Sequence, residues 1–100
     1  MYYAIICEDQ PGSLERRIAN RPAHLQRLQV LQEEGRLLLA GPHPLIDHET
    51  PGSAGFSGSL IVAEFATREA ALAWAADDPY TLAGVFVRVT VKPFKKVFPQ

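Results

Sequence analysis

A histidine and an aspartate are the side chains in this sequence best suited to chemistry. His24 lies in the segment Arg21-Pro22-Ala23-His24-Leu25, and Asp78 lies in the segment Asp77-Asp78-Pro79-Tyr80. Imidazole has an unperturbed pKa close to neutrality, so it suits proton transfer. A carboxylate that accepts a hydrogen bond from one ring nitrogen fixes the tautomer and leaves the other nitrogen free to act. The pair therefore predicts general acid–base chemistry, provided that the fold brings the two residues together.

Each of the two residues also has a simpler structural explanation. His24 can be an ordinary core or surface histidine of the helix that carries it. Asp78 stands before Pro79 and is a natural N-cap, because its carboxylate can accept from the unpaired backbone N–H groups of a helix start. The capping role and the histidine-orienting role are compatible, since a carboxylate has acceptor capacity for both.

The elements that must position the pair alternate between strand and helix. Apolar, β-prone runs predict strands over residues 2–8, 37–40, 59–65 and 85–91, and amphipathic segments predict helices after Ser13, up to Gly35, and over residues 68–76. Arg16 and Arg17 are expected on the exposed side of the first helix, and Pro22 either interrupts that helix or begins a second one. Val85, Val87, Val89 and Val91 alternate strictly, which predicts a last strand with one buried face. Residues 43–56 are expected to form a long loop.

The order β-α-β-β-α-β predicts a single domain over residues 1–100 of the ferredoxin-like α+β class, with a four-stranded antiparallel sheet. Both helices would cover one face of that sheet and leave the other face open and apolar. A face of that size is rarely left to water, so we expect a homodimer. The basic, apolar tail over residues 92–98 is expected to pack its aromatic side chains on the partner subunit.

Charge and cysteine content narrow the function classes. Ten basic and eleven acidic residues give a net charge of −1, which argues against nonspecific nucleic-acid binding and against a basic membrane-binding surface. The single cysteine, Cys7, lies in an apolar run and is expected to be a core residue. His43, Asp47 and His48 match no defined metal-ligand spacing, so neither a metal nor another cofactor is expected. No apolar run is long enough to cross a membrane, and we expect a cytoplasmic protein.

A third group of residues could bind a substrate. The backbone N–H groups near Gly41 and Gly58, together with Ser59, could hold a developing oxyanion or a substrate carboxylate. Arg16 or Arg17 could guide an acidic substrate to the mouth of the site, and Tyr80 lies beside Asp78 as a further candidate for substrate binding.

Short motifs in a fixed order resemble those of the YciI-like family of small bacterial proteins. They are Tyr2-Tyr3, Ser13-Leu14-Glu15, Arg21-Pro22-Ala23-His24-Leu25, Gly35-Arg36-Leu37-Leu38, Ala40-Gly41-Pro42, Ala54-Gly55-Phe56-Ser57-Gly58-Ser59, Asp78-Pro79-Tyr80, Ala83-Gly84-Val85 and Val91-Lys92-Pro93-Phe94-Lys95-Lys96-Val97-Phe98. The resemblance implies a dimeric α+β barrel and an active site around a histidine–aspartate pair, which maps to His24 and Asp78. Relatives in that family include enzymes that eliminate chloride from unsaturated organic acids.

Three hypotheses about function remain open from the sequence. The leading one is an enzyme of small organic molecules, of the lyase or isomerase type, in which His24 is the general acid or base and Asp78 orients it. The alternative is a noncatalytic dimeric module that binds a small ligand, because this fold does not settle function. A weaker option is a structural or partner-binding protein that uses the exposed sheet face.

Overall fold

The computed structural model describes all residues, 1–100, and confirms the expected order of strands and helices. The elements are β1 (Tyr2–Asp9), α1 (Leu14–Glu33), β2 (Leu37–Pro44), the 3-10 turn η1 (Gly52–Ala54), β3 (Phe56–Glu64), α2 (Arg68–Ala76), α3 (Pro79–Leu82) and β4 (Phe86–Phe94). The strands form one sheet in the order β2-β3-β1-β4, and every neighbouring pair is antiparallel. This is the ferredoxin-like α+β arrangement. None of the three α-helices combines the length and the hydrophobicity that a membrane-spanning helix needs.

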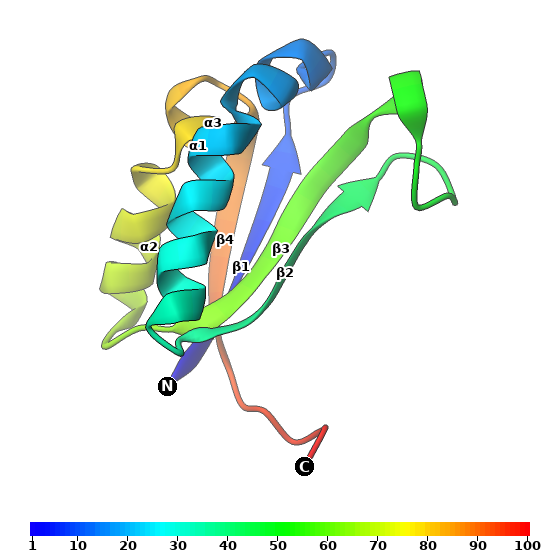
Figure 1. Cartoon of the computed structure of the whole chain (residues 1–100). Helices are drawn as coiled ribbons and strands as arrows, with labels where there is room; N and C mark the ends of the chain where they lie inside the picture. The colour runs from blue at the N-terminus through cyan, green and yellow to red at the C-terminus, as the bar shows by residue number, and fades with distance from the viewer.

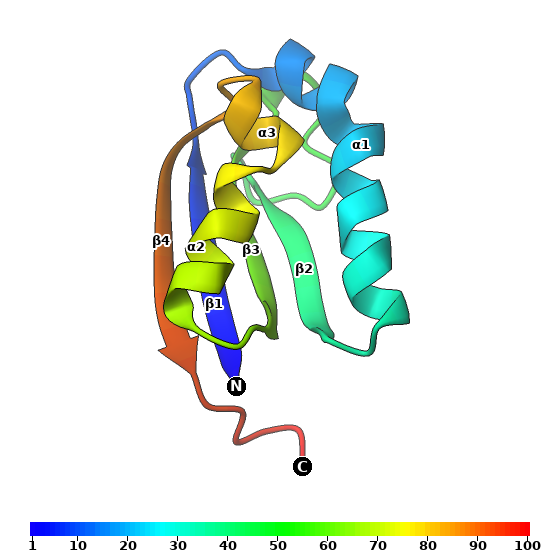
Figure 2. The ribbon, with the colours of Figure 1, turned by 90° about the vertical axis from the view of Figure 1, so that its left-hand side faces the viewer.

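All three helices pack on one face of the sheet (Figures 1 and 2). The register explains the core, because Ile5 of β1 pairs with Ile61 of β3 on one side and with Val91 of β4 on the other. All three side chains are buried in one apolar cluster, which also contains Leu31 of α1. Side chains at the neighbouring positions of each strand point to the opposite face, which no helix covers.

Helix α1 runs through Pro22 without a break, so the expectation that proline divides the segment into two helices is wrong. Proline removes one backbone hydrogen bond and pushes on the preceding turn, which commonly bends a helix without ending it. Figure 1 shows the first turns of α1 set at an angle to the remaining turns. Ser13 takes the N-cap position, but its side chain makes no capping hydrogen bond.

The two edge strands are longer than their apolar runs predict. Strand β2 continues to Pro44 and strand β4 to Phe94, so Lys92, Pro93 and Phe94 belong to the sheet and not to a tail. An edge strand tolerates proline because one row of its N–H groups has no strand to pair with. The predicted loop over residues 43–56 is shorter than expected at both ends, because β2 runs to Pro44 and the internal strand β3 begins at Phe56.

The expected alternation of valines in β4 fails at one position. Val85 and Val91 are buried, but Val87 is 60% exposed. Glu8 pairs with Arg88 whereas Asp9 pairs with Phe86, so the register shifts and Val87 is the extra residue of a β-bulge. Because of this shift, the side chain of Phe86 faces the helices and is buried.

Candidate active site

The structure brings His24 and Asp78 into direct contact beneath the helices. His24 is on α1 and Asp78 immediately precedes α3, and Nδ1 of the imidazole lies 2.9 and 3.0 Å from the two carboxylate oxygens. Both side chains are buried, with 7% and 1% of their surfaces exposed. The contact supports the tautomer in which Nδ1–H donates to Asp78, as the sequence hypothesis requires.

Asp78 is held by two further groups. Its Oδ1 accepts the backbone N–H of Tyr80 at 2.9 Å, which is the predicted N-cap, and its Oδ2 accepts from the guanidinium of Arg27 at 3.1 Å. Arg27 itself lies over the ring of Trp74 at 4.3 Å. The carboxylate is therefore fixed from three directions and cannot turn away from the imidazole.

The other imidazole nitrogen, Nε2, is free. It makes no hydrogen bond within the chain, and Asp9 Oδ1 is the only fully buried side-chain polar atom without a partner. Nε2 is therefore reached by solvent, through the cavity that His24 lines. With the proton on Nδ1, Nε2 presents its lone pair to that cavity and can accept a proton from a bound molecule.

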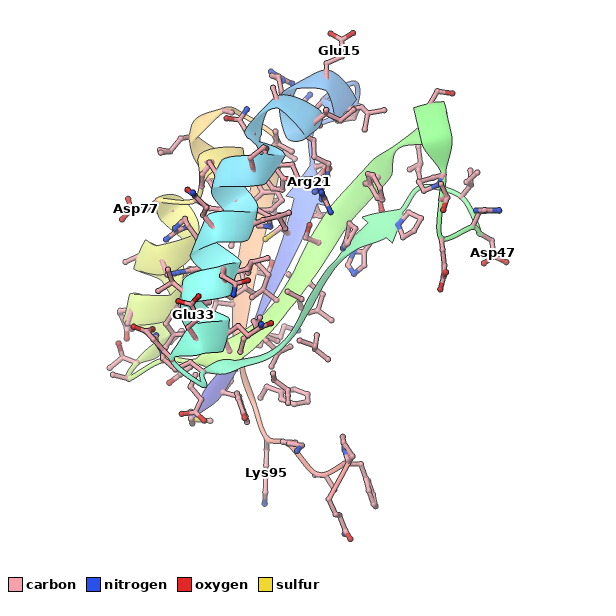
Figure 3. The ribbon with its side chains drawn as sticks, in the orientation of Figure 1. Glu15, Arg21, Glu33, Asp47, Asp77 and Lys95 are labelled. Carbon is pink, nitrogen blue, oxygen red and sulfur yellow. The ribbon has the colours of Figure 1, made fainter.

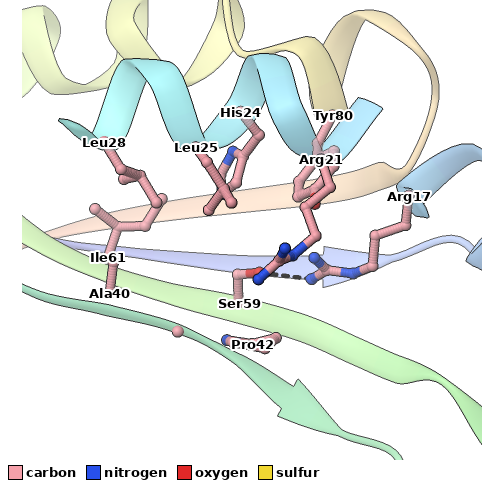
Figure 4. Close-up of a pocket in the computed structure, with 11 residues that line it drawn as sticks. Arg17, Arg21, His24, Leu25, Leu28, Ala40, Pro42, Ser59, Ile61 and Tyr80 are labelled. Atoms are coloured by element: carbon pink, nitrogen blue, oxygen red, sulfur yellow. Dashed lines mark hydrogen bonds between the residues drawn. The ribbon is translucent and has the colours of Figure 1, made fainter. Parts of the chain in front are cut away.

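The cavity lies between α1 and the strands β2 and β3, and its volume is about 170 Å³ (Figure 4). Leu25 and Leu28 of α1 form its apolar wall above the sheet, and Ile61 of β3 lies below them. Its polar end is formed by His24, Ser59, Tyr80 and two arginines, Arg17 and Arg21. The cavity thus has one apolar and one polar end, as sites for small organic ligands commonly do.

Aromatic contacts fix the plane of the imidazole. The ring of Tyr80 stacks on His24 with centroids 4.1 Å apart and an interplanar angle of 18°, while Phe86 meets His24 edge-on at 6.4 Å. Burial raises the pKa of Tyr80, although the nearby guanidiniums of Arg17 and Arg21 oppose the shift. Tyr80 therefore keeps its phenolic proton at neutral pH. The bulge in β4 contributes to the site, because it places Phe86 against His24.

Arg17 is buried, contrary to the expectation that it lies on the exposed side of its helix. Its Nε donates to Asp9 Oδ2 at 3.0 Å, and its terminal nitrogen donates to the Gly58 carbonyl at 2.9 Å and to Ser59 Oγ at 2.6 Å. Burial raises the pKa of Asp9, and the charge and hydrogen bond of Arg17 offset part of that effect. The sequence of α1 alone predicts that Arg17 faces solvent. Arg17 can be buried because Asp9 pairs with it, and Asp9 lies on β1.

The predicted substrate-binding residues divide into two groups. Ser59, Gly41 and Tyr80 line the cavity. Gly58 lies beside it and contributes its carbonyl oxygen to Arg17, whereas Arg16 does not line the cavity.

Arg21 and Arg27 are the two site residues that the sequence interpretation missed. Positions 17, 21, 24 and 28 recur at helical spacing, so they share the face of α1 that bears His24, and this was the available signal for Arg21. Arg27 is three residues after His24 and could have been found from the same spacing.

The remaining candidate ligands and nucleophiles lie elsewhere. Cys7 is 1% exposed, and burial, with a smaller contribution from the charges of Asp78 and Asp9, raises the pKa of its thiol to about 12. It is therefore a neutral core thiol at neutral pH. His43 on β2 and His48 in the following loop are exposed, and no group of three or more histidine, cysteine, aspartate or glutamate side chains is placed to hold a metal ion.

The family model and the full-length relatives that match this chain point to the same family. Residues 1–95 match the YCII-related domain. Protein YciI of Escherichia coli O6:H1 is 59% identical over 98 residues, which cover 98% of this chain and all of that protein, and an uncharacterized protein of Haemophilus influenzae is 57% identical with the same coverage.

A solved structure extends the comparison to an enzyme. The chain superimposes with a TM-score of 0.83 and 30% identity on 5-chloro-2-hydroxyhydroquinone dehydrochlorinase from Burkholderia phenoliruptrix, solved in complex with 2,5-dihydroxybenzoquinone. The alignment covers 95% of this chain and 94% of that one. From the domain match and the full-length relatives together, the chain belongs to the YCII-related, or YciI-like, family.

Proposed function

We propose that this protein is an enzyme that transfers protons on a small organic molecule, with His24 as the general base or acid and Asp78 as its orienting partner. The observation that carries the proposal is the unpartnered Nε2 of a buried, carboxylate-held imidazole that lines a cavity. A histidine with both nitrogens bonded to protein groups would favour a structural role. Here one nitrogen is left for a ligand.

The proposed chemistry is an elimination or an isomerisation. Nε2 takes a proton from a substrate carbon or hydroxyl, and the electron pair of the broken bond forms a double bond. In an elimination the leaving group departs with its own bonding pair, and the imidazolium then returns its proton to solvent or to the leaving group. In an isomerisation an existing double bond shifts instead, and the imidazolium returns its proton to a different atom of the same substrate. Asp78 stabilises the imidazolium throughout, because its carboxylate already faces Nδ1.

Two further observations support this class of reaction over hydrolysis by a covalent intermediate. The only thiol is buried and has a raised pKa, so it is not a nucleophile at neutral pH. The solved relative is named a dehydrochlorinase, and removal of hydrogen chloride is an elimination. Elimination from an unsaturated organic acid is the specific reaction that we consider first.

The test uses proton exchange, because it needs no knowledge of the product. Small carboxylic acids that raise the melting temperature are incubated with the protein in D2O, and loss of substrate C–H signals is followed by NMR. Replacing His24 with alanine is expected to lower the exchange rate by about 10²–10⁴-fold, the usual contribution of a positioned general base. The matched control is His48→Ala, since His48 is exposed and does not line the cavity.

Equal exchange rates in wild type and His24→Ala would contradict the proposal. Ligands that bind both proteins without exchange would instead indicate the noncatalytic binding module.

We also propose that the protein acts as a homodimer through the uncovered sheet face. Tyr2, Ala4 and Ile6 of β1 point to that face, and Leu39 and Phe94 of the edge strands are 47% and 38% exposed. Phe98 of the tail is 74% exposed and could pack on the partner. Size exclusion with light scattering is expected to give twice the mass of the chain at micromolar concentration, and a monomer mass would contradict the dimer.

A further inference from the structure

Two guanidinium groups share the polar end of the cavity, but only one of them has a carboxylate. Arg17 and Arg21 are four residues apart on α1, so they lie one helical turn from each other. Arg17 is paired with Asp9. Arg21 makes no ion pair and no hydrogen bond, and it lies exposed at the mouth of the cavity.

The positive charge is therefore local and uncompensated. No aspartate or glutamate lines the cavity, and Asp78 lies behind His24 with Arg27 as its cationic partner. The whole chain carries a net charge of −1, so the excess is a property of this cavity and not of the surface in general. Two like charges one turn apart destabilise a helix slightly, and a bound anion would relieve that repulsion.

A neutral donor stands beside the two cations. Arg17 donates to Ser59 Oγ, so the oxygen is used as an acceptor and the hydroxyl proton of Ser59 has no acceptor in the chain. Figure 4 shows the guanidiniums of Arg17 and Arg21 both directed toward Ser59. Figure 3 shows Arg21 extending from α1 over the sheet. A planar anion in this position would receive one free guanidinium and one hydroxyl proton.

We propose that Arg21, together with Ser59, binds the anionic head of the substrate, and that the substrate is a small organic monoanion: a carboxylate with an apolar body. One uncompensated guanidinium matches one negative charge, and its planar fork matches two coplanar oxygens. The apolar wall of Leu25, Leu28 and Ile61 receives the body. The cavity of about 170 Å³ is close to the ~150 Å³ that holds one benzene ring.

The proposal rests on the proposed function only in calling the bound anion a substrate. It is tested by binding, with benzoate as the probe and benzamide as a neutral molecule of the same shape. Titration followed by NMR is expected to show that the wild-type protein binds benzoate at least tenfold more tightly than benzamide. Arg21→Met is expected to lose about ten- to a hundredfold in affinity for benzoate and little for benzamide, because it removes a charged hydrogen-bond donor.

Arg16→Met is the matched control. It makes the same charge change on the same helix, and Arg16 is exposed and outside the cavity. It is expected to bind benzoate like the wild type. Equal benzoate affinity in Arg21→Met and wild type, no preference for benzoate over benzamide, or no saturable benzoate binding would each overturn the inference.

The same probe separates this inference from the proposed function. His24→Ala removes the proposed base but leaves Arg21 and Ser59 in place. If His24→Ala still prefers benzoate while His24 proves irrelevant to proton exchange, the anion site stands and the catalytic proposal fails. If proton exchange depends on His24 but benzoate binds equally well with and without Arg21, the catalytic proposal stands and the anion site is wrong.

Discussion

Replacing Asp78 with asparagine is expected to lower proton-transfer activity by about 10³–10⁴-fold while the fold is retained. The carboxylate accepts from Nδ1 of His24, so the wild-type proton is on Nδ1 and the lone pair is on Nε2. An amide can turn its NH2 group toward Nδ1, which moves the ring proton to Nε2 and removes the base from the cavity. The same change in serine-protease triads costs about 10⁴ in turnover.

The tautomer can be measured without a substrate. Ring ¹⁵N shifts of His24 are expected to show Nδ1–H in the wild type and Nε2–H in Asp78→Asn. Asparagine can still cap α3 by accepting from the N–H of Tyr80, but Arg27 loses its charged partner. We therefore expect the free energy of unfolding to fall by about 1–3 kcal/mol, without loss of the fold.

Asp77→Asn is the matched control, because the neighbouring carboxylate is exposed and makes no hydrogen bond or ion pair with His24. It is expected to keep both the wild-type tautomer and the exchange rate. The interpretation of the pair would be wrong if Asp78→Asn kept them as well.

The architecture was largely predictable because its signals are local. Apolar runs and helix periodicity specified the order βαββαβ, and that order leaves few topologies. The ends of β2 and β4 and the bulge at Val87 were not predictable, since they depend on pairing with strands far away in the sequence. Pro44 and Pro93 argue locally against a strand, and only their position at the sheet edges makes them acceptable.

Candidate site residues were predictable where the residue type itself suggests a chemical role. They were not predictable where the position of a side chain depends on an ion pair with a distant residue. His24, Asp78 and Ser59 stand out as candidates from their residue types and neighbours. Arg17 was expected in solvent, because nothing local indicates that Asp9 from β1 would neutralise it inside the protein. Burying an arginine is favourable only when its charge and its donors are satisfied.

Replacing Gly58 with alanine is expected to destabilise the protein by about 3 kcal/mol or more, the largest effect of any single methyl group at a glycine in this chain. A Cβ at Gly58 would overlap the carbonyl oxygen of Cys7 and lie 3.0 Å from its carbonyl carbon. Both atoms belong to the backbone of β1, so no side-chain rotation relieves the clash and β1 must move away from β3. Overpacking against a flexible side chain costs about 1–3 kcal/mol, and a backbone obstacle belongs at the upper end or beyond.

Gly41→Ala is the control, because a Cβ there meets no atom within 4 Å and the residue lies on the edge strand β2. Thermal unfolding is expected to show a melting temperature lower by roughly 10–25 °C for Gly58→Ala and nearly unchanged for Gly41→Ala. The strain also reaches the site, since the Gly58 carbonyl holds Arg17 and Arg17 holds Ser59. A Gly58→Ala variant that still folds is therefore expected to bind benzoate more weakly than the wild type. Wild-type stability of this variant would contradict the prediction, because β1 and β3 would then have to lie farther apart at Gly58 than they do in the structure.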